Sequence, residues 1–180
     1  LWEAENFTIA GQTAPPPGIK IKNGFLELHY SSNGIVSHLD FFVDTGAGLP
    51  SDFDAIQTFG EVHDVVIDHC SGFWGHDECI SVSGVGDGGT LEQIRAQVSH
   101  RVTVSQCVIA EPISGGTYSR PGYGTAITDA VSEAFFWGNY WANCSARSPM
   151  IKGGAQAVLA NNLVYNTEQK GVECSLQGSW

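Results

Sequence analysis

The sequence is poor in positive charge and has no long apolar runs. Only 8 of its 180 residues are Lys or Arg, against 19 Asp or Glu, so the formal net charge is -11. A surface of that sign repels the phosphate backbone of a nucleic acid. No apolar run reaches the roughly 20 residues that a membrane-spanning helix needs. We therefore expect no nucleic-acid partner and no membrane partner.

Helical periodicity is also scarce. Residues 90–99 (TLEQIRAQVS) form the best helical candidate, with Leu91, Ile94 and Val98 spaced for one face. The chain has 22 glycines and only 15% charged residues, which favours a β-rich fold with many tight turns. With 42% hydrophobic residues the chain can bury one sizeable core, so we expect residues 1–180 to form a single domain.

The other apolar residues occur in short β-branched or aromatic runs that predict strands. These runs are residues 7–10, 24–29, 35–42, 65–68, 102–109, 135–141 and 157–164. Several end alike, at Cys70, Cys107, Cys144 and Asn162, and the first two steps between these residues are both 37 residues long. Such a repeat indicates a solenoid of about five coils, with the four residues pointing inward at equivalent bends.

The sequence does not determine which of the cysteines form disulfide bonds. Equivalent Cα atoms in neighbouring coils lie about 4.8 Å apart, a distance that a disulfide can bridge. Cys107 and Cys144 are therefore either bonded or stacked as buried thiols, and Cys70 with Cys79 is a second possible pair.

Two features favour a secreted protein. Asn6-Phe-Thr and Asn143-Cys-Ser are acceptors for N-glycosylation, so we predict glycans at Asn6 and Asn143. The chain opens at Leu1 without a Met, which indicates a processed or incomplete N-terminus. We expect an extracellular location with disulfide bonds.

Three segments, in order, resemble the pectate lyase superfamily. They are residues 6–19 (NFTIAGQTAPPPGI), residues 65–78 (VVIDHCSGFWGHDE) and residues 139–166, which contain NYWANCSARSP, KGG and NNLVYN. The resemblance implies an all-β, right-handed parallel β-helix. It also implies cleavage of pectate, or polygalacturonate, by Ca²⁺-assisted β-elimination in a cleft outside one sheet.

The resemblance assigns roles to individual residues. Arg147, in an Arg-x-Pro motif, falls where the family has its Brønsted base, and Lys152 falls where it has a second substrate-binding Arg. Asp54 and Glu78 match calcium carboxylates, and Asp77 adds a third carboxylate beside them. Ca²⁺ prefers such hard oxygen ligands, and it acts as a Lewis acid on the substrate carboxylate.

Other positions depart from the family pattern. Residues 115–128 lack the expected substrate-binding Lys, so Arg120 is the candidate there, and Val82 replaces a carboxylate. Two hypotheses therefore stand: a pectate lyase, or a catalytically inactive β-helix that binds glycans or forms part of an extracellular assembly. Neither terminus resembles a solenoid cap, so the β-helix is expected to be incomplete at both ends or to self-associate through them.

Two further groups have alternative readings. Asp68 and His69 form a pair that we interpret as structural, at a bend. Trp74, Trp137 and Trp141 could stack on sugar rings, although packing against the protein is favoured.

Overall fold

The computed structural model describes residues 1–44, 52–114 and 121–175, which form three parallel sheets of six strands each. The first sheet holds β1 (Glu5–Ala10), β4 (Ser32–Ser37), β7 (His63–Asp68), β10 (His100–Ser105), β13 (Ala134–Trp137) and β16 (Ala157–Ala160). The second holds β2 (Ile19–Lys22), β5 (Leu39–Phe42), β8 (Ser71–Phe73), β11 (Val108–Ala110), β14 (Tyr140–Ala142) and β17 (Leu163–Tyr165). The third holds β3 (Leu26–His29), β6 (Ile56–Phe59), β9 (Ile80–Val82), β12 (Ala126–Ile127), β15 (Met150–Ile151) and β18 (Glu173–Cys174).

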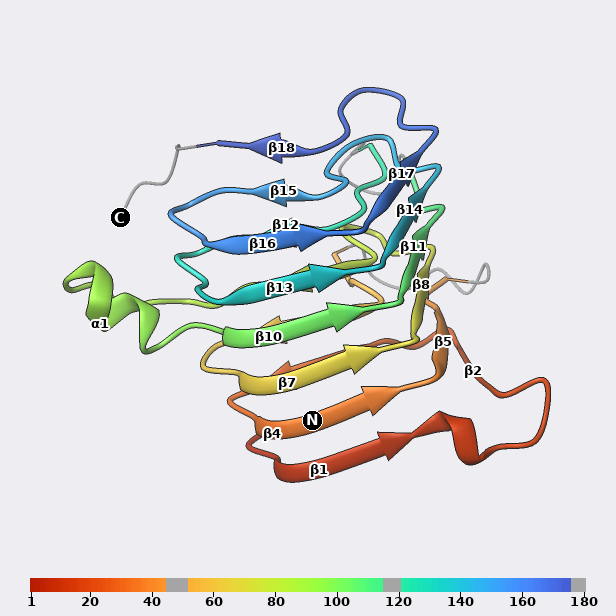
Figure 1. The fold of residues 1–180 in the computed structure, drawn as a ribbon, viewed down its shortest axis with the longest axis horizontal. Coiled ribbons are helices and arrows are strands. Elements are labelled where there is room, and N and C mark those ends of the chain that lie inside the picture. Colours follow the sequence, from red (N-terminus) through yellow and green to blue (C-terminus); the bar gives the residue numbers. More distant parts are fainter. Residues whose placement is uncertain (45–51, 115–120, 176–180) are drawn as a thin grey trace.

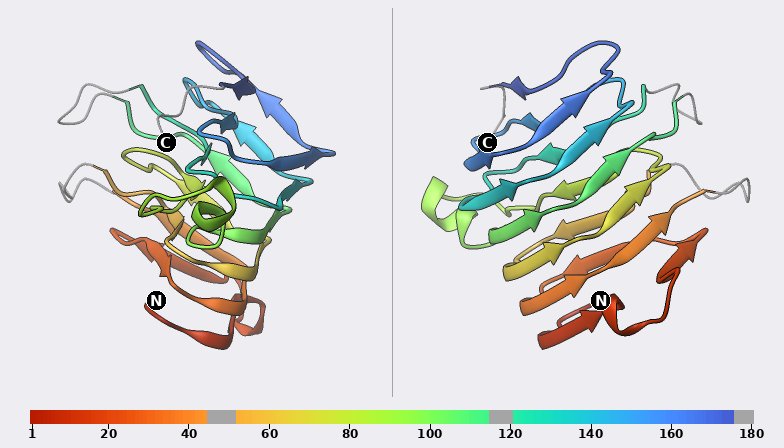
Figure 2. Two further views of the ribbon diagram at one scale, coloured as in Figure 1. Left: turned by 90° about the vertical axis from the view of Figure 1, so that its left-hand side faces the viewer. Right: turned by 45° about the vertical axis from the view of Figure 1, so that its right-hand side comes forward.

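The chain visits the three sheets in turn and climbs by one strand per circuit. In Figure 1 each coil crosses the front, passes along the right-hand side and returns behind, rising toward the C-terminal end, which is a right-handed path. Figure 2 shows the same stack from two other directions. The predicted right-handed parallel β-helix is thus confirmed, with six coils in place of about five.

The core consists of columns of apolar side chains that run along the solenoid. Val36, Ile67, Val104 and Phe136 follow one another in register on the first sheet, and all four are fully buried. Because side chains alternate between the two faces of a strand, every second residue joins such a column. The in-register stacking explains why each run is short and rich in β-branched or aromatic residues.

Four of the expected strands turn a corner within their length. The runs at residues 35–42, 102–109, 135–141 and 157–164 each divide into a strand of the first sheet and a strand of the second. The bends have positive φ at His38, Gln106, Gly138 and Asn161, and the coil between the first two of these has the same bend at His69. One left-handed residue is enough to turn the chain, so the apolar pattern continues across the corner.

The residue after each bend points inward, as predicted for Cys70, Cys107 and Asn162. Cys144 does not belong to this column: it follows β14, at the corner between the second and third sheets, and Asn139 takes the place predicted for it. The coil between Cys107 and Asn139 is shorter than the one before, and the additional residues of β14 restore the 37-residue spacing by coincidence.

All five cysteines are free thiols, so neither disulfide considered from the sequence is present. Cys107 and Cys144 lie at different corners, while Cys70 and Cys107 contact backbone carbonyl oxygens. Burial raises the pKa of Cys70 and of Cys144 to about 11. These buried thiols fill the core.

The predicted helix is present but short. α1 spans Leu91–Arg95, and Thr90 caps it through reciprocal hydrogen bonds with Gln93. Ile94 and Val98 are buried, whereas Leu91 is exposed. Figure 1 shows α1 projecting from the side of the stack. Among the described residues, no helix has the length and apolar character needed to cross a membrane.

Candidate functional site

The candidate site lies at the corner between the second and third sheets. Asp54 and Glu78 precede β6 and β9 by two residues each, and these strands pair in parallel with Ile56 opposite Ile80. Tyr123 forms an isolated parallel bridge with Glu78 on one side and with Ala146 on the other. Residues far apart in the sequence therefore lie side by side in successive coils. We call Asp54, Asp77, Glu78, Tyr123 and Arg147 the Arg147 centre.

The guanidinium of Arg147 is held between acidic and aromatic side chains. Its Nη1 donates a hydrogen bond to Glu78 Oε1 and lies 3.7 Å from Asp77 Oδ1. Its Cζ lies 3.5 Å from the centroid of the Tyr123 ring, a cation–π contact. The side chain is 23% exposed, so it is partly shielded from water but open on one side.

The backbone of Arg147 is fixed as well. Its φ is 56°, in the left-handed region, and its N–H donates to Glu173 Oε1 at 3.0 Å. Its carbonyl oxygen accepts from the Thr125 N–H at 2.7 Å. The contacts come from both neighbouring coils, which sets the direction in which the side chain leaves the corner.

Two carboxyl groups of the centre are buried close together. Asp54 accepts from the Glu78 N–H at 2.8 Å and from the Ser81 hydroxyl. Burial raises the pKa of Asp54 well above its ordinary value, and the charge of Glu78 adds to the shift. Burial also raises the pKa of Glu78 to about 7, with a further contribution from Asp77 and an opposing one from Arg147. The corner thus holds more acidic groups than one guanidinium neutralises.

The donor set suits Ca²⁺ in chemistry but is not arranged as a finished site. Asp54, Asp77 and Glu78 supply hard oxygens, and their clustered charge favours a divalent cation. However, the described part of the chain contains no group of three or more His, Cys, Asp or Glu side chains positioned to hold a metal. Glu78 already accepts a hydrogen bond from Arg147, and Asp54 already accepts hydrogen bonds from the Ser81 hydroxyl and the Glu78 N–H.

Of the two candidates for binding substrate carboxylates, Lys152 and Arg120, only Lys152 lies among the described residues. Lys152 is partly exposed just after β15, and its positive charge acts to lower the pKa of Glu78. Arg120 lies outside the described residues. Val82, expected from the family pattern to be a carboxylate, is fully buried in β9 and faces the core. That position therefore contributes packing and no metal ligand.

The two predicted glycosylation sites differ in their surroundings. Asn6 is exposed on β1, the outermost strand of the first sheet. Asn143 is also exposed, but its side-chain amide donates to Glu111 Oε1 at 3.4 Å and accepts from Asn166 Nδ2 at 2.8 Å. The Asn6 side chain is therefore the freer acceptor.

The Asp68–His69 pair lies at a bend, and Trp74, Trp137 and Trp141 differ in burial. His69 Nδ1 lies 2.6 Å from Asp68 Oδ2 at a bend, as expected for a structural pair, and Ser105 donates to Asp68 Oδ1 at 2.5 Å. Trp141 is fully buried, Trp137 is exposed and Trp74 is half-buried. Of these three described tryptophans, Trp141 alone belongs to the core.

No sequence pattern indicated that Tyr123 belongs to the centre, or that Ser81 and Glu173 contact Asp54 and the Arg147 backbone. Each lies in a connection or short strand without a distinctive motif, and each joins the centre only through stacking of coils. Tyr123 could have been suspected only if its alignment with Glu78 in the preceding coil had been known.

Comparisons with known proteins agree with the motifs. No family model matches the chain. Similar curated proteins are named probable pectate lyase C: one from Emericella nidulans is 29% identical over 163 residues, and one from Aspergillus terreus is 27% identical over the same length. The aligned part is 91% of this chain but 33% of each relative, so the chain spans about a third of the curated relatives it matches. The resemblance to pectate lyase-like proteins is thereby confirmed.

Proposed function

We propose that the chain is a polysaccharide lyase that cleaves pectate by β-elimination, with Arg147 as the base. The observation that carries the proposal is the placement of Arg147 against Glu78 and beside Asp77, in the corner that also holds Asp54. The candidate base and the candidate calcium carboxylates share one site. The similarity to proteins named probable pectate lyase C supports the choice of substrate.

In β-elimination a base removes the proton from C5 of a uronate residue. The electron pair forms the C4–C5 double bond, the glycosidic C4–O bond breaks, and the departing oxygen takes up a proton. Arg147 would accept the C5 proton on a guanidine nitrogen, so it must first leave Glu78 and lose its own proton. Because a guanidinium normally keeps its proton, the proposal requires an alkaline optimum.

The remaining charged residues would bind and orient the substrate. Lys152 and Arg120 would pair with substrate carboxylates, and Tyr123 would hold the plane of the Arg147 guanidinium. Asp54, Asp77 and Glu78 would hold Ca²⁺, which when bound supplies Lewis-acid stabilisation of the carboxylate next to C5. With Val82 in the core, we expect weaker activity than in relatives with the full motif.

The test is formation of unsaturated uronate from polygalacturonate, followed by ultraviolet absorbance. We expect product with added Ca²⁺ at alkaline pH, none after chelation, and recovery when Ca²⁺ is restored. A correctly folded, calcium-loaded chain that forms no product would contradict the proposal. It would instead favour a glycan-binding or structural β-helix, a role consistent with the engagement of Arg147 by Glu78.

We also propose that the protein acts outside the cell, where its proposed polysaccharide substrate is accessible. The exposed Asn6 sequon supports this location. Expression in a secretory host should give a mass increase that glycosidase treatment removes, and Asn6→Gln should abolish most of it. Secretion without any such increase would contradict glycosylation at Asn6.

A further inference from the structure

A cavity on the outer side of the second sheet lies apart from the Arg147 centre. It has a volume of about 620 Å³, and the described residues that line it are Lys20, Lys22, Phe42, Asp44, Trp74 and Ile113. None of the residues of the Arg147 centre lines it. We call it the Lys22–Trp74 pocket.

The pocket gathers positive charge in a strongly acidic chain. Lys20 and Lys22 alternate with Ile21, which packs against the core, so both lysines point outward from β2. Neither lysine makes an ion pair or a side-chain hydrogen bond within the part of the chain that the structure describes. Two of the 8 basic residues therefore face one cavity with their charges available for a ligand.

The acidic neighbours do not cancel this charge. Asp44 Oδ2 lies 3.1 Å from His76 Nε2, and that carboxylate is 13% exposed. Asp40 lies opposite Lys20 in the strand register, but no ion pair joins them. Phe42 lies opposite Lys22, so the second lysine borders an apolar wall. Lys22 is thus the stronger candidate for an anionic ligand.

The apolar wall of the pocket is built from stacked aromatic rings. The Phe42 and Phe73 rings are stacked with centroids 5.1 Å apart, and the Trp74 ring meets Phe42 edge-on at 5.2 Å. Small-ligand sites combine such preformed apolar surfaces with a few polar groups that orient the ligand. An apolar wall beside two ammonium groups suits a ring that carries a carboxylate.

The same loop connects the pocket with the Arg147 centre. Trp74 lines the pocket, and Glu78, four residues later, contacts Arg147. The loop is fixed between them, because the Ile113 N–H donates to the Gly75 carbonyl and the His76 N–H donates to the Phe53 carbonyl, both at 2.9 Å. Four residues span at most about 14 Å, so one polysaccharide chain can reach both places.

We propose that the Lys22–Trp74 pocket is a second binding site, specific for an acidic sugar residue of a polysaccharide. The sugar carboxylate pairs with Lys20 and Lys22, and the ring packs on Phe42 and Trp74. The expected polymer, pectate, comes from the proposed function, but binding in the pocket needs neither Arg147 nor cleavage.

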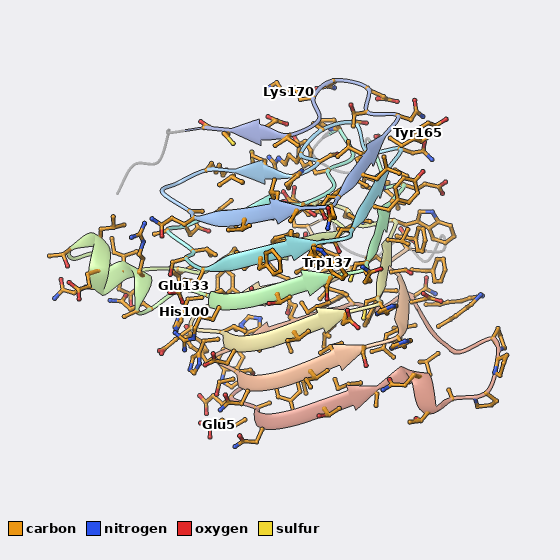
Figure 3. All side chains as sticks on the ribbon, viewed as in Figure 1. Glu5, His100, Glu133, Trp137, Tyr165 and Lys170 are labelled. Carbon is orange, nitrogen blue, oxygen red and sulfur yellow. The ribbon has the colours of Figure 1, made fainter. Side chains whose placement is uncertain are left out.

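The experiment measures binding of an oligogalacturonate by calorimetry, in chelator, to the Arg147→Ala chain, which cannot cleave the ligand if Arg147 is the base. Starting from that chain, we expect Lys22→Ala and Lys20→Ala each to weaken binding by up to about fivefold. Lys170→Ala removes the same charge from the opposite end of the solenoid, where Figure 3 labels Lys170, and should leave binding unchanged. Trp74→Phe should weaken binding while keeping an aromatic ring against Phe42.

The chemistry of the ligand provides a second control. An oligogalacturonate with fully methyl-esterified carboxyl groups keeps the sugar rings but loses the charge, so we expect it to bind at least about fivefold more weakly. Equal binding of the two ligands would overturn the assignment of an acidic sugar.

The outcomes separate this proposal from the proposed lyase activity. Binding that survives Lys20→Ala and Lys22→Ala would overturn the pocket and leave the lyase proposal intact, because that proposal rests on the Arg147 centre. Binding that depends on Lys22 in a chain that never cleaves polygalacturonate would support the pocket and contradict the lyase. Equal weakening by Lys170→Ala would show a general charge effect and overturn the pocket.

Discussion

The two corners that flank the second sheet are built on different principles. At the corner entered from the first sheet, every coil but the first turns within one or two residues, with one left-handed residue and an inward side chain. At the corner that leads to the third sheet, the connections range from residues 23–25 to residues 111–125. The uniform corner closes the core, whereas the variable corner carries the Arg147 centre.

Hydrogen bonding explains why the corner between the first and second sheets stays short in the later coils. Asn139, 1% exposed, accepts from the Cys107 N–H at 2.9 Å and donates to the Val104 carbonyl at 2.9 Å. Asn162 repeats the pattern one coil later, accepting from the Asn139 N–H and donating to the Phe136 carbonyl. An insertion here would leave buried backbone groups unpaired, whereas an insertion at the other corner extends into solvent.

The acidic groups at the two corners also behave in opposite ways. At the bend, burial of Asp68 acts to raise its pKa, but hydrogen bonds from Ser105 and His69 outweigh it and lower the pKa. In the Arg147 centre, burial dominates and raises the pKa of Asp54 and Glu78. The bend stabilises charged carboxylates, whereas the centre disfavours them unless a cation lies beside them.

The largest expected difference between the two corners is the loss of activity when Arg147 is replaced. Arg147→Ala should lower the rate of unsaturated-uronate formation by about 10²–10⁴-fold, the usual contribution of a general base, and should leave the circular dichroism spectrum unchanged. Arg101→Ala is the matched control, because Arg101 pairs with Asp64 on the first sheet, away from the centre. Full activity in Arg147→Ala would exclude Arg147 as the base.

A substitution at the bend between the first and second sheets should lower stability without changing the Arg147 centre. Asn139→Ala leaves the Cys107 N–H and the Val104 carbonyl without partners, so we expect a loss of about 2–4 kcal/mol in the free energy of unfolding, measured with urea. Asn162→Ala, at a partly exposed position near the end of the stack, should have a smaller effect. Equal losses would argue against burial as the cause.

The raised pKa of Glu78 predicts a pH-dependent stability in the absence of metal. Between about 4.5 and about 7 the folded state keeps a proton on Glu78 that the unfolded state has released. Stability should therefore fall as pH rises through this window, by at most about 1.4 kcal/mol per pH unit from this group. Urea unfolding in chelator at several pH values should show a shallower slope for Glu78→Gln. An unchanged slope would show that Glu78 does not titrate in this window.

The smallest expected effect is at Asp68. Its pKa is lowered in the folded state, so its contribution to stability is present above its unfolded pKa of about 3.8 and disappears as pH falls through the folded value. Because Asp68 is partly exposed, Asp68→Asn should lower the free energy of unfolding at pH 7 by less than about 1 kcal/mol. The difference from the wild type should shrink in acid, and a difference that grows there would contradict the lowered pKa.

The sequence by itself determined the repeating part of this protein. Short β-branched runs, the 37-residue step from Cys70 to Cys107 and the three family motifs predicted a parallel β-helix, and Thr90 marked the start of α1. These features are local, because inward and outward residues alternate along each strand whatever the next coil contains. The motifs also identified Asp54, Glu78 and Arg147, which the structure brings to one corner.

Only the tertiary structure decided which residues meet between coils. In the structure Cys144 lies outside the inward column, and Tyr123 contacts Arg147. Lys22 lines the same pocket as Trp74, which lies 52 residues later in the sequence. The reason is that coils differ in length, because the connections that lead into the third sheet and those that leave it differ in length. A residue's neighbours in the adjacent coils are set by the hydrogen-bonded register of the strands, and spacing along the chain does not reveal that register.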